Sequence, residues 1–414
     1  MTEEVNQKLS KAKEVSRRFV MTSEAQRTAA LLAMADAMER HVEKILAANT
    51  EDLAAAEESN LAAKRRGILR VTEKDIVAMA EFFRSAAQLD DPVGWLLEDV
   101  TDERGLRREK KMVPLGVVAM IAEARPSVLT DSAALCIRTG NGLVFLGSRH
   151  SVNTDTAVEV VLQDALQSVG LPSELITNIP GDHELAYDIV KQDRLVDLAI
   201  IRGGYEAIRE IKREATVPVL GAGPGNCHIY IDGKADPVMA MNIVRNSKVP
   251  RPLACNAAET ILVERCWAEK HLCALLDDLT ANGIVLRGTE VVCALCPAVS
   301  LAEERDWEEE YFAPTLAVKL VAGIEEAIGH INCYRTPHTE CIITEDPVAA
   351  ALFMAQVEAN VVCHNAATRL TDGVVFDLGG EMGISTQKYP AGGPIGPLHL
   401  MQQKYYLSGN GVLR

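Results

Sequence analysis

Hydrophobic positions in the first part of the chain follow a helical period. Ser23 and Gln26 have the spacing of a capping box, which marks a helix start. The apolar residues that follow recur at helical spacing, namely Leu31, Met34, Ala35, Met38, Val42, Ile45 and Leu46. The segment GLRREKKMVP, at 105–114, instead alternates and is basic, which is typical of an exposed or oligomer-pairing strand. We therefore expect opening helices and an arm-like strand.

From residue 115 onward, apolar strands alternate with amphipathic helices. The first set has strands GVVAMIA, GLVFLG and DLAII and helices near 131–138, 154–168 and 204–213. The alternation restarts after CHIYID, with helices near 236–246, 268–281 and 347–357 and strands ETILVE, GIVLRG, LAVKLV, ECIIT and NVVC. This order predicts an α/β fold of two doubly wound domains. The glycine-rich C-terminal segment ends in KYYLS, which indicates a tail that packs on a partner subunit.

Composition and charge narrow the classes of partner. The chain has 414 residues and a net charge of −16, which disfavours nucleic acid and anionic membranes. No apolar run approaches the roughly 18 residues of a membrane span, and the charged N-terminus lacks a signal peptide. We therefore expect a cytoplasmic protein with reduced cysteines. The C-x-x-C of Cys293 and Cys296 has no second ligand pair at zinc spacing, so we expect packing and no metal site.

Two glycine-rich segments are candidates for a phosphate site. GAGPGN, at 221–226, precedes the strand-like CHIYID, whereas a dinucleotide fingerprint must lead into a helix. IIRGGYEAIREI, at 200–211, has strand, glycine turn and helix in the required order. The main-chain N–H groups at the start of that helix could face an anion.

Cys255, in the segment RPLACNAAET, differs from the other nine cysteines in its neighbours. Lys248 and Arg251 precede it and Asn256 follows it. Nearby positive charge would lower the pKa of the thiol and raise the fraction of nucleophilic thiolate. Cysteine is also among the residue types most often buried, so a structural role is the alternative.

RPLACNAAETILVER resembles the nucleophile segment of the γ-glutamyl phosphate reductase family, a branch of the aldehyde dehydrogenase superfamily. Further segments resemble that family in the same order, namely VPLGVVAMIAEARPSV (113–128), LCIRTGNGLVFLG (135–147), IIRGGYEAIRE (200–210), CHIYID (227–232), EEEYFAP (308–314), NAATRLTDG (365–373) and GEMGISTQK (380–388). The resemblance implies an aldehyde dehydrogenase-like fold with a cofactor domain over 1–100 and 114–228 and a catalytic domain over 229–384. It implies an oligomerisation arm over 101–113 and 385–414.

The resemblance also implies a reaction of two steps. The Cys255 thiolate attacks the acyl phosphate of L-glutamyl 5-phosphate, and NADPH then reduces the thioester to glutamate 5-semialdehyde. A thioester accepts hydride far better than a carboxylate does, so cysteine suits both steps. Main-chain N–H groups beginning at Cys255, with the side chain of Asn256, would bind the oxyanion. Gly221 lies where hydrolytic relatives carry a glutamate base, and its presence favours reduction over hydrolysis.

The remaining site residues are carried over from the same motifs. Arg125, Asn365 and Arg369 are expected to bind the substrate, whose carboxylate and phosphate suit guanidinium groups. Glu310, in EYFAP, is expected to contact the nicotinamide ribose. The turn of Arg202, Gly203 and Gly204 is expected to lie beside the cofactor. Glutamate 5-kinase, which makes the labile acyl phosphate, is a candidate protein partner, and we expect a homodimer or homotetramer.

Several positions depart from the family pattern. Leu146 stands where the family has an arginine, so we expect Arg149 to replace it as the partner of the cofactor 2′-phosphate; otherwise NADH becomes the cofactor. Gly392, Pro390 and Ala367 stand for arginine, histidine and serine. Two alternatives therefore stay open. One is a reductase of another acyl phosphate or an acyl-CoA, and the other is a non-catalytic homologue that binds the kinase.

Overall fold

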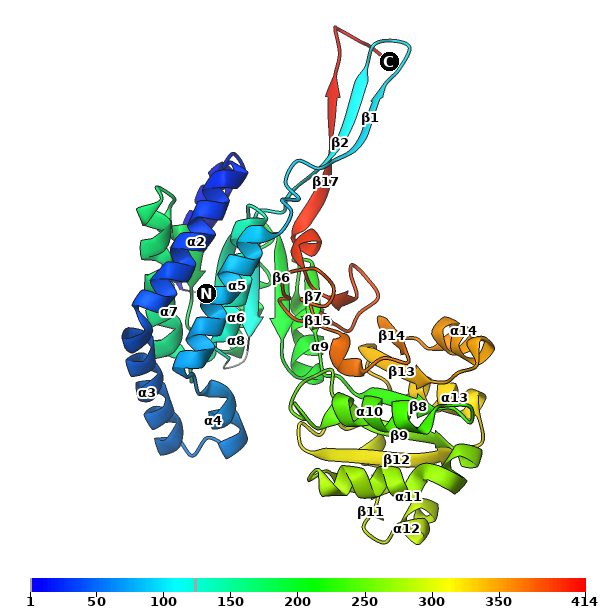
Figure 1. Cartoon of the computed structure of the whole chain (residues 1–414). Coiled ribbons are helices and arrows are strands. Elements are labelled where there is room, and N and C mark those ends of the chain that lie inside the picture. Colours follow the sequence, from blue (N-terminus) through cyan, green and yellow to red (C-terminus); the bar gives the residue numbers. More distant parts are fainter. Residues whose placement is uncertain (1, 123–124) are drawn as a thin grey trace. The chain divides into compact units, whose positions relative to one another are not determined.

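The computed structural model describes residues 2–122 and 125–414, apart from the side chains of 63–65. The chain forms two compact units (Figure 1). The first unit comprises Met1–Ala222, Phe376–Gly383 and Ile395–Arg414, and the second comprises Gly223–Val375 and Ile384–Pro394. The predicted division after residue 228 lies later than the observed one, because β8 (Cys227–Ile231) joins the sheet of the second unit.

The first unit opens with helices, as predicted. The N-terminal helices are α1 (Glu3–Phe19), α2 (Glu24–Arg40), α3 (Val42–Glu58), α4 (Ala63–Leu69) and α5 (Glu73–Gln88). Ser23 caps α2, because its side chain accepts a hydrogen bond of 3.4 Å from the N–H of Gln26. The later helices are α6 (Ser127–Arg138), α7 (Val152–Ser168), α8 (His183–Ile189) and α9 (Tyr205–Glu214).

These helices surround a five-stranded parallel sheet in the order β5-β4-β3-β6-β7. The strands are β3 (Val117–Ala122), β4 (Gly142–Leu146), β5 (Ile176–Asn178), β6 (Leu198–Arg202) and β7 (Val219–Ala222). Apolar residues of α1, α8 and α9 form one core cluster with residues of β3, β4 and β6. Strand order reverses between β3 and β6, so the carboxyl ends of these two strands flank a topological switch point, where open α/β sheets bind ligands.

The second unit contains a seven-stranded parallel sheet in the order β11-β10-β12-β9-β8-β13-β14. Besides β8, its strands are β9 (Ala258–Glu264), β10 (Val285–Gly288), β11 (Ser300–Leu301), β12 (Thr315–Val321), β13 (Thr339–Ile343) and β14 (Val361–His364). Its helices are α10 (Pro237–Lys248), α11 (Arg265–Ala281), α12 (Glu290–Leu295), α13 (Ile324–Tyr334) and α14 (Pro347–Gln356). A small hairpin pairs β15 (Ile384–Ser385) with β16 (Gly393–Pro394).

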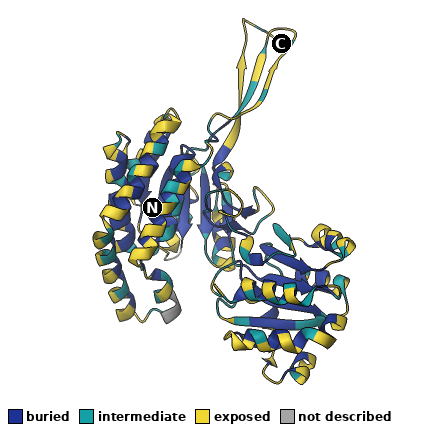
Figure 2. Ribbon diagram, viewed as in Figure 1, coloured by how far each residue is buried: buried dark blue, intermediate teal, exposed yellow. Residues whose placement is uncertain are grey.

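The second sheet is doubly wound, because separate core clusters cover its two faces. One cluster joins α10, α11 and α12 to the sheet, and the other joins α13 and α14. Figure 2 shows the central strands of both parallel sheets in the buried colour and the outer faces of the helices in the exposed colour. The predicted fold class, two doubly wound α/β domains with an additional β-arm, is confirmed.

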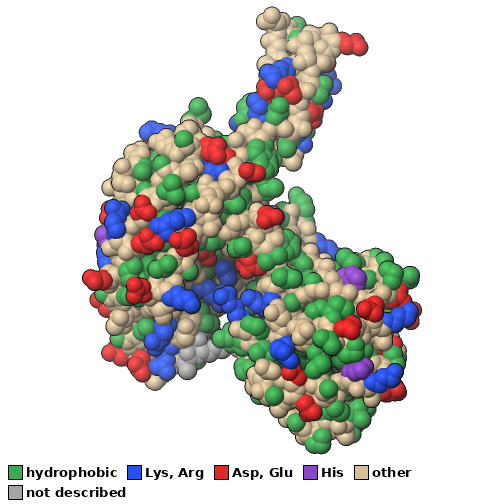
Figure 3. Space-filling view, in the orientation of Figure 1, with side chains coloured by type: hydrophobic (Ala, Val, Ile, Leu, Met, Phe, Trp, Pro, Cys, Tyr) green, Lys and Arg blue, Asp and Glu red, His purple; other side chains and the backbone are tan. Residues whose placement is uncertain are grey.

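The arm is a three-stranded antiparallel sheet of the first unit. It consists of β1 (Leu96–Thr101), β2 (Arg107–Pro114) and β17 (Met401–Ser408), with β2 in the centre. The alternating basic segment is therefore a strand, as predicted, and KYYLS is its neighbour, with Lys404 opposite Lys111. Figure 3 shows acidic and basic side chains interspersed along the arm. No helix of the described residues is long and apolar enough to span a membrane.

Candidate active site

Cys255 lies in the turn that joins the end of α10 to the start of β9. It is half-buried, and none of the ten cysteines, all of which are described, is in a disulfide. The turn is closed by main-chain hydrogen bonds, from Ala254 N–H to Arg251 at 3.2 Å and from Ala257 N–H to Ala254 at 2.9 Å. These two hydrogen bonds hold the predicted nucleophile in a defined conformation at the amino end of a buried strand.

Gly225 closely approaches the main chain of Cys255. A Cβ atom at residue 225 would overlap the carbonyl oxygen of Cys255 and would lie 2.7 Å from its carbonyl carbon. Only glycine leaves room for this approach. GAGPGN thus has a structural function that its sequence does not reveal, because its last glycine supports the nucleophile turn.

Cys227 contacts both the nucleophile turn and His338. The Cys227 thiol donates to the Cys255 carbonyl at 3.4 Å, and its sulfur lies 3.7 Å from His338 Nδ1. Burial raises the pKa of Cys227 well above its usual range, so this group stays a thiol and can donate. Three neighbouring strands of the sheet, β8, β9 and β13, begin one to three residues after Gly225, Cys255 and His338, respectively. Parallel pairing therefore gathers these three segments at one edge.

Asn256 links the nucleophile turn to Arg369. The Arg369 guanidinium donates to Asn256 Oδ1, and Asn256 Nδ2 donates to the Thr371 carbonyl at 2.9 Å. The Thr368 hydroxyl also donates to the Asn256 carbonyl at 2.7 Å. The structure thus brings Arg369 beside the nucleophile segment, as a substrate-binding arginine requires. The Asn256 amide itself holds the turn that contains Thr368 and Arg369.

Asn365 does not lie in the segments that surround the nucleophile turn. Its side chain bonds both main-chain groups of Thr344, each at 2.9 Å, and its φ of 52° lies in the left-handed region. Asparagine tolerates that conformation better than most residues. Asn365 follows the carboxyl end of β14, whereas Cys255 precedes the amino end of β9, a parallel strand of the same sheet. Its contact with substrate stays a prediction.

The expectation that Lys248 acts as a positive charge beside Cys255 needs correction. Lys248 is fully buried, and its ammonium group pairs with Glu259 at 2.5 Å. Burial lowers the pKa of Lys248, and it raises the pKa of Glu259 to about 8 although Lys248 opposes that shift. Burial in this pair therefore disfavours the charged form of Lys248, on which the expectation depends. This pairing could not be read from the sequence, since the partners lie on α10 and β9.

Glu310 contacts Gly225, which packs against the nucleophile turn. Its Oε1 accepts a hydrogen bond of 2.9 Å from the N–H of Gly225. This bond fixes Gly225, whose close approach defines the position of Cys255. The predicted contact of Glu310 with a cofactor ribose stays a prediction beside this observed role.

In the first unit, the predicted binding residues gather at the carboxyl edge of the sheet. Arg125 follows β3, Arg149 follows β4, and Arg202 ends β6. Gly204 caps α9 without a side-chain hydrogen bond, and no atom of residues 2–122 or 125–414 lies within 4 Å of the position that a Cβ would take there. The N-terminus of α9 is thus open to a phosphate, with Arg202 and Gly203 directly before it. These residues fit a nicotinamide dinucleotide at the switch point between β3 and β6.

Arg149 and Leu146, at the carboxyl end of β4, differ in exposure to solvent. Leu146 is buried in the core cluster of the first sheet. Arg149 is exposed in the turn between β4 and α7. Its position allows the predicted contact with a cofactor phosphate.

Asp131 is a charged group in this region that sequence reasoning missed. It lies on α6, half-buried, and interacts electrostatically with Arg202, Glu381 and Arg125. Burial, assisted by Glu381, raises the pKa of Asp131 to about 7 although both arginines favour its ionised form. A carboxyl group that titrates near neutrality between two predicted binding arginines is a candidate functional residue. Its spacing from Arg125 gave no motif that could have revealed it.

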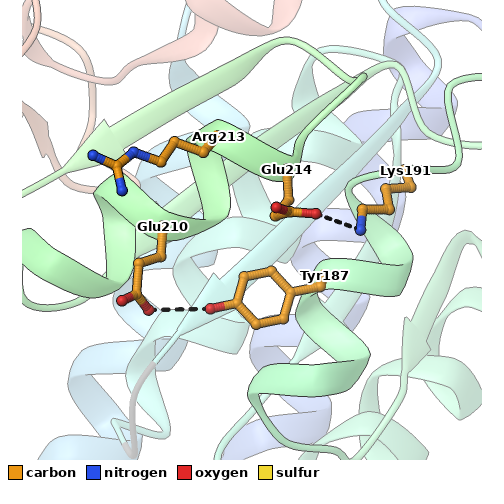
Figure 4. A pocket seen from close by; sticks show the side chains of 5 residues that line it. All are labelled: Tyr187, Lys191, Glu210, Arg213 and Glu214. Carbon is orange, nitrogen blue, oxygen red and sulfur yellow. Dashed lines mark hydrogen bonds and ion pairs between the residues drawn. The ribbon is translucent and has the colours of Figure 1, made fainter.

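A surface hollow of about 450 Å³ lies between α8 and α9 of the first unit (Figure 4). Tyr187, Lys191, Glu210, Arg213 and Glu214 line it. Two pairs bridge the helices, Tyr187 with Glu210 at 3.2 Å and Lys191 with Glu214 at 2.7 Å. None of the predicted site residues lines this hollow, so it does not contribute to the candidate active site.

Comparison with known proteins agrees with the fold. The sequence model of the aldehyde dehydrogenase family matches residues 1–300. The crystal structure of gamma-glutamyl phosphate reductase from Thermotoga maritima superposes with a TM-score of 0.94 at 33% identity, covering 100% of both chains. The fold of two doubly wound units and this family match place the chain in the aldehyde dehydrogenase family.

Full-length relatives define the branch of that class. Gamma-glutamyl phosphate reductase of Bacillus velezensis is 43% identical over 412 residues, covering 99% of each chain. The protein of the same name from Bacillus subtilis is 41% identical over 412 residues, with the same coverage of both chains. This chain therefore belongs to the gamma-glutamyl phosphate reductase branch of the aldehyde dehydrogenase family, as its motifs predict.

Proposed function

We propose that this chain reduces L-glutamyl 5-phosphate with NADPH to L-glutamate 5-semialdehyde and phosphate, a step of proline biosynthesis. The observation that carries the proposal is the hydrogen bond between Asn256 and Arg369, which places a guanidinium group beside the predicted nucleophile. Arginine binds phosphate or carboxylate in bidentate fashion, as an anionic acyl phosphate requires. Full-length similarity to proteins named for this activity supports the same assignment.

Cys255 is the nucleophile of the proposed reaction. Its thiolate attacks the acyl carbon, the carbon–oxygen bond to phosphate breaks, and phosphate leaves with the electron pair of that bond. The resulting thioester remains on Cys255 until reduction releases the aldehyde and restores the thiolate. When bound, NADPH would supply the hydride for this second step.

Main-chain N–H groups of the nucleophile turn are the oxyanion donors in this proposal. The Asn256 amide donates to the carbonyls of Thr371 and Arg369, at 2.9 and 3.5 Å. Its primary contribution is therefore to position the turn, while the N–H groups of Cys255 and Asn256 would bind the developing charge. Fixed donors need no reorganisation during the reaction, which is the source of their catalytic effect.

The cofactor would be held by the carboxyl edge of the first sheet. Arg202, Gly203 and Gly204 would offer a cation and main-chain N–H groups to its phosphates, and Arg149 would bind the 2′-phosphate that distinguishes NADPH from NADH. The open N-terminus of α9 supports the first contact. Exposure of Arg149 at the end of β4 supports the second.

Replacing Arg149 by alanine is expected to raise KM for NADPH about tenfold and to leave KM for NADH unchanged. A charge-assisted contact with phosphate contributes about 1.5 kcal/mol, which corresponds to that factor. Steady-state kinetics with both cofactors measure the difference. Arg194→Ala, which removes an exposed arginine outside the proposed cofactor contacts, serves as control. Equal changes in both KM values would remove Arg149 from the 2′-phosphate site.

Replacing Asp131 by asparagine is expected to lower KM for the anionic ligands at pH 8 and to have little effect at pH 6. Asp131 ionises as pH rises through about 7, and its negative charge then reduces the positive potential of Arg125 and Arg202. Asparagine stays neutral throughout. One unit charge at close range contributes about 1 kcal/mol in water, or about fivefold in KM. Parallel pH profiles for variant and parent would contradict this role.

The function itself is tested in the reverse direction, because the aldehyde is more stable than the acyl phosphate. Glutamate 5-semialdehyde, phosphate and NADP⁺ should give NADPH, measured by absorbance. Turnover with coenzyme A in place of phosphate would instead identify an acyl-CoA reductase. Absence of turnover with either acceptor would favour a binding protein.

The compartment and the partners belong to the same proposal. We assign the enzyme to the cytoplasm, as a homodimer or homotetramer joined through the arm, and we keep glutamate 5-kinase as a candidate donor of the substrate. Exposed apolar side chains on the arm support association, among them Leu97, Tyr405 and Leu407.

A further inference from the structure

Three cysteines lie on or directly beside α11 and α12, in the second unit and apart from the nucleophile turn. Cys273 is exposed on α11, Cys293 is half-buried on α12, and Cys296 is buried directly after α12. The Sγ atoms of Cys273 and Cys296 are 3.1 Å apart, although 23 positions separate them in the sequence. These cysteines form no group of three ligands that could hold a metal ion, within the part of the chain that the structure describes.

The close partner of Cys296 is thus Cys273, not Cys293 of the C-x-x-C motif. The Cys293 thiol donates to the carbonyl of Gly288 at 3.6 Å. The Cys273 thiol also lies 3.8 Å from the Leu295 carbonyl, so it contacts the end of α12 at two points. The sequence motif therefore identifies one member of the pair and misses the other.

We infer that Cys273 and Cys296 are a reversible oxidative modification site, at which a hydroperoxide or a low-molecular-weight disulfide converts the two thiols into an intramolecular disulfide. This inference concerns a site that the proposed reaction does not use, and it does not depend on the proposed function.

With a hydroperoxide, the reaction has two steps. The exposed Cys273 thiolate attacks the peroxide, which is reduced to an alcohol or water while Cys273 becomes a sulfenic acid. Cys296 then attacks the Cys273 sulfur and loses its proton, the sulfur–oxygen bond breaks, and water leaves. Two thiols have lost two electrons and two protons to the peroxide. Burial, and then the hydrogen bond with Cys273, raise the pKa of Cys296 to about 12, which makes Cys273 the group that reacts first.

The surrounding structure allows the remaining approach of the two sulfur atoms. A disulfide requires a separation of about 2.05 Å, roughly 1 Å less than the observed one. α12 has only six residues, and it leads into β11, an exposed two-residue strand at the edge of the sheet. Short edge elements of this kind yield at lower cost than the central strands do.

The test is a map of cysteine pairing in the full-length protein after treatment with hydrogen peroxide. Thiols are blocked with N-ethylmaleimide before digestion, and peptides are compared by mass with and without dithiothreitol. We expect a cross-linked pair of peptides that contain Cys273 and Cys296 and that separate on reduction. Alkylation of both cysteines after peroxide treatment, with no cross-linked pair, would overturn the inference.

Serine variants separate this pair from its neighbour. Cys273→Ser should abolish the cross-linked peptide completely, whereas Cys293→Ser, the matched control in the same cluster, should retain it. A cross-link between Cys293 and Cys296 in the parent, or its loss in Cys293→Ser, would assign the oxidation to the C-x-x-C motif and reject the pair proposed here. Circular dichroism of each variant confirms folding, and the map of the parent protein stands independently of the variants.

Discussion

Replacing Cys255 by serine is expected to lower kcat/KM by about 10³-fold or more while the protein stays folded. That factor corresponds to about 4 kcal/mol of transition-state stabilisation. A serine hydroxyl is not ionised near neutral pH, and an oxygen ester accepts hydride poorly compared with a thioester. The half-buried site accommodates the smaller oxygen without a change of shape. Reverse-direction kinetics measure the loss, and thermal unfolding measures stability.

Cys333→Ser is the matched control for this variant. Cys333 is exposed on α13, in the same unit, and is not part of the nucleophile turn. The control should keep the activity of the parent. A Cys255→Ser enzyme as fast as the parent would remove the thioester from the mechanism. Loss of activity in both variants would point to a general effect on the protein.

Replacing Gly225 by alanine is expected to reduce kcat/KM about 10²-fold and to lower the free energy of unfolding by about 1–3 kcal/mol. The added Cβ overlaps the carbonyl oxygen of Cys255, and this contact is with main chain, which cannot rotate away. Either the nucleophile turn or the segment of Gly225 must move. The alanine keeps the N–H that donates to Glu310, so the effect isolates steric displacement.

Gly329→Ala is the control for this second prediction. Gly329 lies inside α13, and no atom of the described part of the chain is within 4 Å of the position that its Cβ would take. Alanine in a helix interior should stabilise the protein by about 0.5–1 kcal/mol and leave kcat/KM unchanged. Chemical denaturation and steady-state kinetics compare both variants with the parent. If Gly225→Ala retains full activity, the close approach to Cys255 has no catalytic consequence.

The polar support of the nucleophile shows why some residues escaped sequence reasoning. Gly225, Cys255 and His338 are far apart in the chain, and only the pairing of β9 with β8 and of β8 with β13 gathers them. The same reason explains why the sequence predicted a charge from Lys248 beside Cys255. The ion pair of Lys248 with Glu259 forms only when α10 packs against β9. The pKa of Asp131 is raised by burial and by Glu381, which is distant in the sequence, whereas Arg202 and Arg125 oppose the shift.

At Gly392 the structure adds a reason for one departure from the family pattern. A Cβ at residue 392 would lie 2.7 Å from Asn360 Nδ2 and closer to other atoms of that side chain. The Asn360 amide is already held by the Ser385 carbonyl at 2.7 Å. A larger side chain at this position therefore requires Asn360 to move. Such a contact between distant segments is not visible in the sequence.

The sequence by itself determined the order of helices and strands, the fold class and the nucleophile segment. Hydrophobic period is a local property, and the RPLACNAAET motif is continuous, so both can be read along the chain. The tertiary structure alone decided which distant groups meet: Gly225 beneath Cys255, Arg369 against Asn256, and Cys273 beside Cys296. These contacts depend on strand pairing and helix packing across many residues, and no local pattern encodes them.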